Sequence, residues 1–487
     1  MPLALALRDA SFHVREVRLR LPFRFGVITV TEATLLHLAI TAESDGGGRA
    51  RGFAADFLAP KWFDKDPTKS HRRNVEDLVE SARDAHAAYA GAARAPRAFW
   101  PIWRDAYAEC RRHGAARGYN GLVASFGSSL FERALADAAG RLAGADVVEM
   151  LRQDVLGLRP GEIHAGLAGG RALAWAHGAP PETVAVRHTV GLVDPITAGD
   201  LPPDGGPRDG LARTLEEYVA RHGLRYFKLK VAGQVDGDLD RLARVAAVLD
   251  RLIPDRYVVT LDGNEQYKAL EPFAELLALL EREPRLSRLA SAVAFVEQPL
   301  DRAIALDPAA TGGLAALARR WPMLIDESDG DLDSFQTAIA LGYGGVSSKN
   351  CKGIVKAFLN RSLVERLNAG HAPDQRLFMS AEDLTNVPIV PLQQDLATVR
   401  ALGLSHVERN GHHYIRGLAH CSPAEREAAT RRHADLYEGD EREAALGIRD
   451  GRLALGSLAV PGYGVAFDPD LASMTPLETW LARTSAA

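Results

Sequence analysis

A regular alternation of short strands and helices between residues 184 and 410 constrains the fold of this chain most strongly. Eight strand-like runs each precede an amphipathic helical run. The strand runs are AVRHTVGL, RYFKLKV, YVVTLDGN, VAFVEQP, MLIDES, GVSSKN, RLFMSAED and SHVERN. A doubly wound sheet also alternates, but no Gly-x-Gly-x-x-Gly follows the first run, and no self-similar unit indicates a repeat protein. The pattern predicts an α/β fold, a (β/α)₈ TIM-like barrel.

The chain is too long for a barrel alone. Such a barrel takes about 250 residues, whereas this chain has 487. Near its start, VREVRLRLPF and TLLHLAITAE alternate apolar and polar residues, which predicts strands. Residues 60–125 are irregular, so we expect either a loop region or a small helical insertion. Ser129 and Glu132 have the spacing of a capping box and predict a helix start.

Charge and cysteine content exclude several classes of function. The net charge of -5 gives no reason to expect nucleic acid or an anionic membrane as a partner. Cys110, Cys351 and Cys421 lie far apart, which argues against a disulfide framework or a structural zinc site and fits a reducing compartment. Neither a signal peptide nor a membrane span is evident. We therefore expect a cytoplasmic location.

Charged residues follow the predicted strands at the points where the strands end. TIM-barrel enzymes carry their catalytic residues at these carboxyl ends. A charge that follows a buried apolar strand needs a partner, because an isolated buried charge is very costly. In chain order these positions carry Lys228 and Lys230, Asp262, Glu297, Asp326 and Glu327, Lys349, Glu382 and Asp383, and Glu408. The expected site therefore lies at this end of the barrel.

Asp262, Glu297 and Asp326 come from three consecutive predicted strands. Neighbouring strands lie about 4.8 Å apart, so the three carboxylates should converge and repel one another unless a cation joins them. Oxygen ligands favour Mg²⁺, with Mn²⁺ possible, over zinc. The alternative is that each carboxylate pairs with a nearby Arg or Lys, but we favour a metal for the ordered set. Glu327 should face away from Asp326, either supporting the ligands or replacing Asp326 as the third.

Lys228 and Lys230 are two residues apart on one predicted strand, so their side chains point the same way. Two adjacent ammonium groups lower each other's pKa, and a lysine that titrates near neutral pH can act as a general base. Lys349 follows the sixth strand and should lie across the barrel from this pair. Lys352 could take its place, but it lies past the strand end. A substrate held between them would have a lysine on each face.

His406, His412, His413 and His420 form a histidine-rich stretch that could suggest a second metal site. Their spacing is irregular, and no carboxylate or cysteine pattern joins them. We therefore favour surface or capping histidines, or a single contact with a substrate.

The strings FKLK, LDGN, VEQP, IDES and SSKNCKG, in this order, resemble the enolase superfamily. Within it, they are similar to the muconate lactonizing enzyme subgroup of the mandelate racemase/muconate lactonizing enzyme family, which includes dipeptide epimerases and o-succinylbenzoate synthases. The resemblance covers residues 184–410 well and both ends of the chain more weakly. Five ordered motifs make it far more specific than any one of them.

The resemblance implies an α+β capping domain that the N-terminal part forms and the C-terminal segment completes. We expect the cap at residues 1–155, with an insertion near 60–125, the barrel at 184–455, and a return to the cap at 456–487. LPFRFG with Phe25, and KWFDKDP with Trp62, would then lie on loops that cover the site. The chain is longer than ordinary members near 60–125 and 410–450, and these segments bear on the choice of substrate.

The resemblance also implies roles for individual residues. Mg²⁺ would be bound by Asp262, Glu297 and Asp326. Lys230, supported by Lys228, and Lys349 would be the acid/base groups on opposite faces. Asn264 and Gln298 match positions that orient the ligands, and Glu408 falls where some members bind the enolate oxygen of the substrate.

These observations predict abstraction of the proton α to the carboxylate of a small substrate, through a metal-stabilised enolate. Lysines on opposite faces favour a racemase or epimerase, of a dipeptide or an N-acyl amino acid. Cycloisomerisation or β-elimination, which need one lysine, is the alternative within the superfamily. A barrel that binds a ligand without chemistry is the alternative from another class. The resemblance also makes a homo-oligomer the expected assembly.

Overall fold

The protein is described by a computed structural model that covers residues 1–487 apart from 1, 26–27, 170–172, 204, 441–442 and 487. Eight parallel strands form a closed barrel in sequence order, because the last of them pairs with the first. They are β5 (Thr183–Val190), β6 (Tyr226–Lys230), β7 (Val258–Asp262), β8 (Val293–Glu297), β9 (Met323–Ile325), β10 (Gly345–Ser348), β11 (Phe378–Ala381) and β12 (His406–Arg409). The predicted barrel and its eight strands are confirmed.

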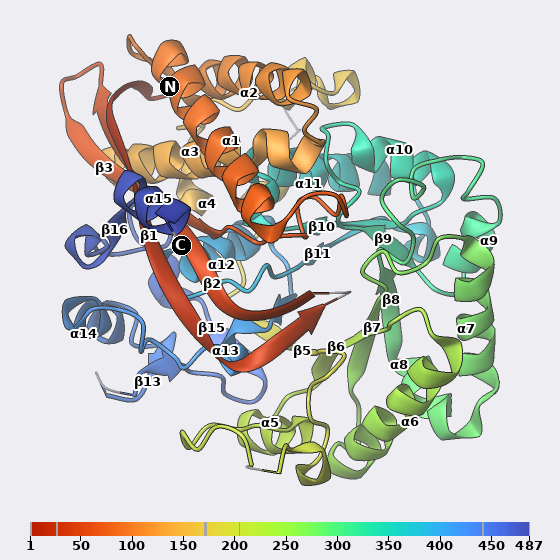
Figure 1. Ribbon diagram of the computed structural model, residues 1–487. Helices are drawn as coiled ribbons and strands as arrows, with labels where there is room; N and C mark the ends of the chain where they lie inside the picture. Colours follow the sequence, from red (N-terminus) through yellow and green to blue (C-terminus); the bar gives the residue numbers. More distant parts are fainter. Residues whose placement is uncertain (1, 26–27, 170–172, 204, 441–442, 487) are drawn as a thin grey trace.

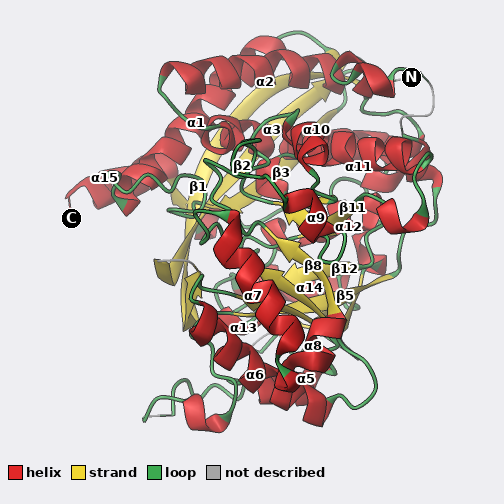
Figure 2. Cartoon of the chain, turned by 90° about the vertical axis from the view of Figure 1, so that its right-hand side faces the viewer, coloured by secondary structure: helices red, strands yellow, loops and turns green. Residues whose placement is uncertain are grey.

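Helices cover the outside of the barrel (Figures 1 and 2). They are α5 (Leu215–His222), α6 (Val235–Leu252), α7 (Leu270–Arg282), α8 (Ser287–Ala292), α9 (Leu314–Ala318), α10 (Ser334–Leu341), α11 (Ile354–Asn368) and α12 (Val390–Leu402). Helix α5 shows how local sequence sets their ends. The Thr214 side chain accepts a hydrogen bond from the backbone of Glu217 at its start, and Gly223 takes a left-handed conformation at its end.

An antiparallel sheet and three helices form the cap above the barrel (Figure 1). The sheet contains β1 (Ala4–Phe25), β2 (Ile28–Ser44) and β3 (Arg49–Phe57), and the helices are α1 (His71–Ala92), α2 (Phe99–Ala116) and α3 (Gly121–Ala143). The segment 60–125 is thus largely helical. The predicted capping box is wrong, because α3 begins earlier: Asn120 caps it, and Ser129 and Glu132 are buried in its interior.

The C-terminal segment returns to the cap. Strand β16 (Thr475–Pro476) pairs with β1, and α15 (Leu477–Ala486) follows it. Shorter elements complete the fold: β4 (Arg97–Ala98), α4 (Val147–Arg152), α13 (Gly411–Tyr414), α14 (Pro423–Arg432), β13 (Tyr437–Glu438), β14 (Ala445–Leu446) and β15 (Arg452–Ala454). Strand β15 lies antiparallel on β5, outside the closed ring.

Buried ion pairs join the cap to the barrel. Arg20 of β1 donates 2.6 and 2.8 Å hydrogen bonds to Asp209 and a 3.0 Å hydrogen bond to the backbone oxygen of His413. Arg15 donates to Glu425 of α14. The long strand β1 therefore fixes the cap against the loops at the barrel mouth.

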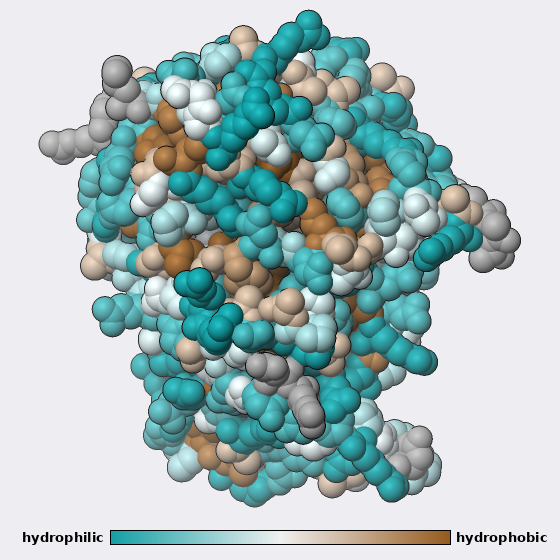
Figure 3. Space-filling model, turned by 90° about the vertical axis from the view of Figure 1, so that its left-hand side faces the viewer, coloured by the Kyte–Doolittle hydropathy of each residue, from teal (hydrophilic) through white to brown (hydrophobic). Residues whose placement is uncertain are grey.

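On the face shown in Figure 3, hydrophobic residues lie in small groups among hydrophilic ones. Among the described residues, no helix is both long and apolar enough to cross a membrane.

Replacing Gly127 by Ala should destabilise the cap. A Cβ at Gly127 of α3 would lie 2.2 Å from the backbone oxygen of Ser81 on α1, so the two helices would have to separate. We expect the free energy of unfolding to fall by about 1–3 kcal/mol in urea denaturation. Gly91→Ala is the control, because a Cβ there meets nothing within 4 Å. Equal stability of the two variants would contradict the packing described.

Candidate active site

The predicted charged residues meet inside the carboxyl end of the barrel. Strand register explains this for three of them, because Lys230 pairs with Asp262 and Asp262 pairs with Glu297 across β6, β7 and β8. Asp326 directly follows β9, and Lys349 directly follows β10. The side chains of Asp262, Glu297 and Asp326 are completely buried.

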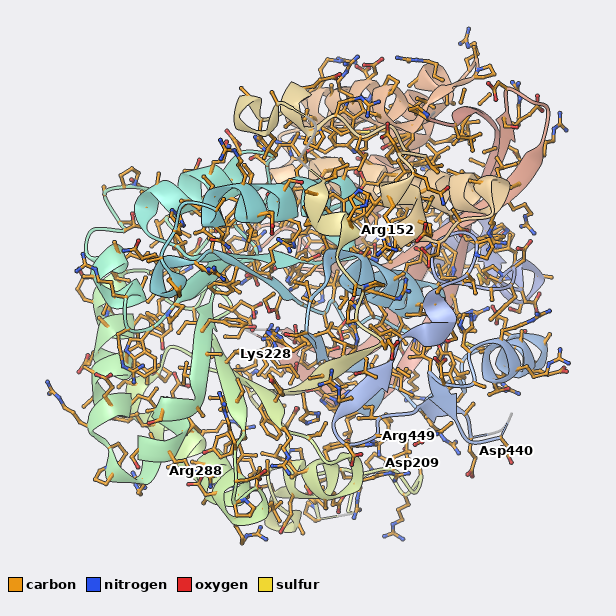
Figure 4. All side chains as sticks on the ribbon, turned by 180° about the vertical axis from the view of Figure 1, so that it is seen from behind. Arg152, Asp209, Lys228, Arg288, Asp440 and Arg449 are labelled. Carbon is orange, nitrogen blue, oxygen red and sulfur yellow. The ribbon has the colours of Figure 1, made fainter. Side chains whose placement is uncertain are left out.

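Lys228 lies at the centre of the site, within the ring of barrel strands (Figure 4). Its Nζ is 2.9 Å from Asp262, 2.7 Å from Glu297, 2.9 Å from Glu382 and 2.8 Å from Glu408. One buried ammonium group thus joins carboxylates from four strands. The supporting role of Lys228 stays a prediction, and these contacts are compatible with it.

The other two lysines lie at the two ends of the row of carboxylates. Lys230 Nζ is 2.5 Å from Asp262, the first of the row, and Lys349 Nζ is 2.6 Å from Asp326, the last. Glu297 is on the strand between them. The arrangement leaves one lysine on each side of the central carboxylate.

The prediction that adjacent lysines lower each other's pKa is wrong for Lys228. Burial alone would lower the pKa of Lys228, but the four surrounding carboxylates outweigh it and raise the pKa well above its usual value. Burial alone would also lower the pKa of Lys349. The attraction of the Asp326 carboxylate is stronger than this effect and raises the pKa of Lys349. Carboxylates, rather than neighbouring ammonium groups, dominate the field at both lysines.

The carboxylates are suited to a hard divalent cation. Burial, and then repulsion from Asp262 and Glu382, raises the pKa of Glu297 well above its usual value. The positive charges around Glu297 therefore do not fully compensate its ionised carboxylate. The Oε2 atom of Glu327 is buried and accepts no hydrogen bond from the described residues. Closely spaced carboxylate oxygens are the donors that hard cations take. The residues present therefore fit the predicted metal.

Gln298 and Asn264 hold the loops that carry the carboxylates. The side-chain oxygen of Gln298 accepts a 2.8 Å hydrogen bond from the backbone of Asp326, and the backbone N–H of Asn264 donates a 2.8 Å hydrogen bond to Asp262. Both residues have positive φ values, 33° and 42°, so the chain turns sharply after β8 and β7. These hydrogen bonds hold Asp262 and Asp326 in place, and the orienting role toward a metal stays a prediction.

Asp326 and Glu327 point to different neighbours, as their adjacency predicts. Asp326 contacts Lys349 and Ser347, whereas Glu327 accepts a 3.3 Å hydrogen bond from the side chain of Asn264. Burial and the neighbouring Asp326 raise the pKa of Glu327 to about 7. Asp326 is therefore paired with Lys349 and Glu327 lies beside it, and the choice of Asp326 as the third ligand stays a prediction.

The cap loop that contains Trp62 covers the site. The Nζ atom of Lys349 lies 4.6 Å from the centre of a Trp62 ring. Arg302 fixes this loop by donating hydrogen bonds to the backbone oxygens of Trp62 and Phe63 while it pairs with Glu265. Trp62 thus lies beside Lys349, and its predicted role on a loop that faces the substrate stays a prediction. The side chain of Phe25 lies outside the described part of the chain.

Sequence reasoning missed Arg187 and gave Glu382 no role. Arg187 of β5 is fully buried, pairs with Glu382, and donates hydrogen bonds to Thr260 and Ser380. A lone arginine in the strand AVRHTV was the available signal. Lys352 does not take the place of Lys349: its Nζ is 3.0 Å from Asp329 and contacts Asp326 at 3.4 Å.

Glu408 lies opposite the row of carboxylates. It accepts hydrogen bonds from Lys228, from the Thr189 hydroxyl at 2.6 Å and from the backbone of Asp383 at 2.9 Å. Burial would raise its pKa, but Lys228 and nearby lysines hold it well below the usual value. Glu408 therefore remains ionised and faces the interior of the barrel.

Comparison with known families identifies the family of this chain. Residues 210–471 match the family described as "Enolase C-terminal domain-like". This chain belongs to the enolase superfamily. Members of the superfamily are enzymes. No curated protein matches the chain.

Solved structures of superfamily members share the whole fold. A Bradyrhizobium enolase solved with magnesium and mandelic acid is 18% identical, with a TM-score of 0.58 over 97% of this chain and 98% of that one. The 2-chloromuconate cycloisomerase of Rhodococcus opacus 1CP is 17% identical (TM-score 0.59; 95% and 97%). The L-Ala-D/L-Glu epimerase of Bacillus subtilis is 14% identical (TM-score 0.56; 95% and 99%). These likenesses confirm the fold and the resemblance.

Replacing Arg187 by Met should destabilise this superfamily member strongly, because the variant leaves Glu382 buried without its arginine. We expect the free energy of unfolding to fall by about 3–5 kcal/mol. Arg225→Met, which breaks an exposed pair with Asp255, should cost no more than about 1 kcal/mol. Denaturant unfolding measures both. If Arg187→Met lowers the free energy of unfolding no more than Arg225→Met does, the buried pair does not stabilise the barrel.

Proposed function

We propose that the chain is a racemase or epimerase that removes the proton α to a substrate carboxylate and returns a proton to the opposite face. A dipeptide or an N-acyl amino acid is the proposed substrate. The observation that carries the proposal is the placement of Lys230 and Lys349 at opposite ends of the buried row Asp262, Glu297 and Asp326. A protein that only binds a ligand has no need for two buried lysines in this arrangement.

We propose that Asp262, Glu297 and Asp326 hold Mg²⁺, with Mn²⁺ as a substitute. The bound ion would supply positive charge against the negative charge that develops on the substrate carboxylate when its α proton leaves. Gln298 and Asn264 keep the carboxylate-bearing loops in place, as their hydrogen bonds indicate. A magnesium-bound superfamily structure from an alphaproteobacterium, 14% identical, is consistent with this assignment.

Each acid/base lysine needs a different charge state at the start of the reaction. The lysine on the side of the departing proton must be neutral to accept it, and the lysine on the other side must be protonated to donate. Lys349 shares its charge with Asp326, and Lys230 shares its charge with Asp262. A divalent cation that shared these carboxylates would reduce the negative field at each lysine, which would favour loss of its proton. The ring of Trp62 lies over Lys349, 4.6 Å from its Nζ atom.

Magnesium should stabilise the protein through Glu297. Magnesium at 100 times its dissociation constant should add about 2.7 kcal/mol of stability, seen as a rise in melting temperature. Glu297→Gln should remove this response and still fold, because the amide has the shape of the carboxyl group. The exposed residue Glu275 provides a control, since Glu275→Gln should respond as the original chain does. An undiminished response in Glu297→Gln would contradict the assigned ligand.

Exchange of the α proton in D₂O tests the two-lysine arrangement. Each enantiomer of a dipeptide or N-acyl amino acid should take up deuterium and lose chirality, followed by NMR and chiral chromatography. Lys349→Ala should slow exchange from one enantiomer by about 10²–10⁴-fold and Lys230→Ala should do so from the other, because each variant lacks one base. Lys268→Ala, at an exposed position, is the control. Equal retention of both exchanges in Lys349→Ala would contradict the two-base reaction.

A cycloisomerase or dehydratase is the second candidate, and similarity to the 2-chloromuconate cycloisomerase favours it. These reactions need one lysine. Ring formation or loss of water from a candidate acid, without inversion, would support this candidate over the epimerase. We also propose a cytoplasmic homo-oligomer, which size measurement in solution tests.

A further inference from the structure

Three histidines from opposite ends of the barrel sequence meet on its outer side. His188 lies on β5, the first barrel strand, and His412 and His413 lie on α13, just after β12, the last. The ring of His188 lies 5.0 Å from that of His412 and 4.5 Å from that of His413, between ring centres, and the latter two rings are 4.8 Å apart. The three rings therefore form one cluster at the seam where β12 closes onto β5.

The cluster is separate from the row of carboxylates. His188 alternates along β5 with Arg187 and Thr189, which contact Glu382 and Glu408 inside the barrel. Successive side chains on a strand point to opposite faces. His188 therefore faces outward, where it packs against Tyr218 of α5 with 4.9 Å between ring centres.

The ring nitrogens have the spacing of a metal site. One nitrogen from each ring lies within 4.8 Å of one nitrogen from each of the others. Nδ1 of His188 is 2.9 Å from Nε2 of His412. In a tetrahedral site with zinc–nitrogen bonds of about 2.0–2.1 Å, the ligand nitrogens lie slightly farther apart than this pair. The rings of His188 and His412 would therefore have to separate only slightly to bind an ion.

Unused nitrogens strengthen this assignment. Nδ1 of His412 and Nδ1 of His413 are buried and have no hydrogen-bond partner among the described residues. His188 and His413 are only 2% exposed, so water does not readily satisfy them. A purely structural cluster would leave these donors and acceptors unsatisfied.

We propose that His188, His412 and His413 bind one divalent transition-metal ion of the zinc class. Neutral imidazoles suit Zn²⁺, Co²⁺ and Ni²⁺, whereas the oxygen-rich carboxylate site suits Mg²⁺. Asp194 lies 3.6 Å from Nε2 of His413, where a carboxylate can orient the ring and offset positive charge. His412 also lines a cavity together with His222 and Tyr218.

The ion would fasten the barrel seam and the cap together. It joins the first barrel strand to the segment after the last, which adds to the backbone pairing of β5 with β12. His413 also accepts a hydrogen bond from Arg20 of cap strand β1 through its backbone oxygen. The inference does not depend on the proposed epimerase activity, because it uses none of the same side chains.

Metal analysis tests the proposal with saturating Mg²⁺ present to occupy the carboxylate site. The full chain, freed of metal with a chelator and dialysed against Zn²⁺, should retain one equivalent of zinc by mass spectrometry and show a raised melting temperature. Co²⁺ in its place should give the visible absorption of a tetrahedral, nitrogen-ligated ion. His188→Asn and His412→Asn should each weaken Zn²⁺ binding by at least about 10–100-fold.

His420→Asn is the matched control. It lies on the same segment, but its ring contacts the backbone oxygen of Pro388 rather than the cluster, so zinc binding should be unchanged. The wild-type measurement decides the matter even where a variant does not fold. Less than a stoichiometric amount of zinc on the wild-type chain, the absence of a tetrahedral cobalt spectrum, or full binding by folded His412→Asn would overturn the site.

Discussion

The buried carboxylates at the barrel mouth set the central physical constraint on this protein. Asp262, Glu297 and Asp326 have no exposed surface, and ionised groups in such a place are stable only beside positive charge. Lys228 supplies part of that charge and contacts four carboxylates from four strands. The raised pKa of Glu297 shows that the neutralisation is incomplete. A divalent cation at this position would supply the positive charge that Glu297 lacks.

Buried charge next to the site also fixes the cap in place. Arg302 pairs with Glu265, in the loop after β7, and holds the backbone of Trp62 and Phe63 above the site. Lys65, from the same cap loop, also contacts Glu265 at 2.5 Å. The loop that follows Asp262 and the cap loop above it are therefore fixed to each other by shared charges. The same ion pairs therefore hold the cap loop over the site and fix the loop that follows Asp262.

The barrel and the row of carboxylates could be predicted because each strand end is a local feature. In YVVTLDGN, for example, the apolar run indicates a strand, the Gly and Asn indicate where it ends, and the Asp is the charged residue at that end. The prediction placed the start of α3 too late, because Asn120 rather than Ser129 accepts the capping hydrogen bond. Ser129 and Glu132 resemble a helix start in sequence, but they are polar residues buried in the middle of α3. The pKa of Lys228 was misjudged because it depends on Glu382 and Glu408, which reach it only through barrel closure. His188 and His412 are 224 residues apart, and no local pattern could join them.

Anomalous scattering from crystals grown with Mn²⁺ tests the central claim most directly. The account predicts a peak bonded to one oxygen each from Asp262, Glu297 and Asp326, at about 2.0–2.2 Å as for a small hard cation. It also predicts that Lys230 and Lys349 flank the peak on opposite sides. A peak bound elsewhere in the barrel, or no peak with the three carboxylates still paired only to lysines, would contradict it.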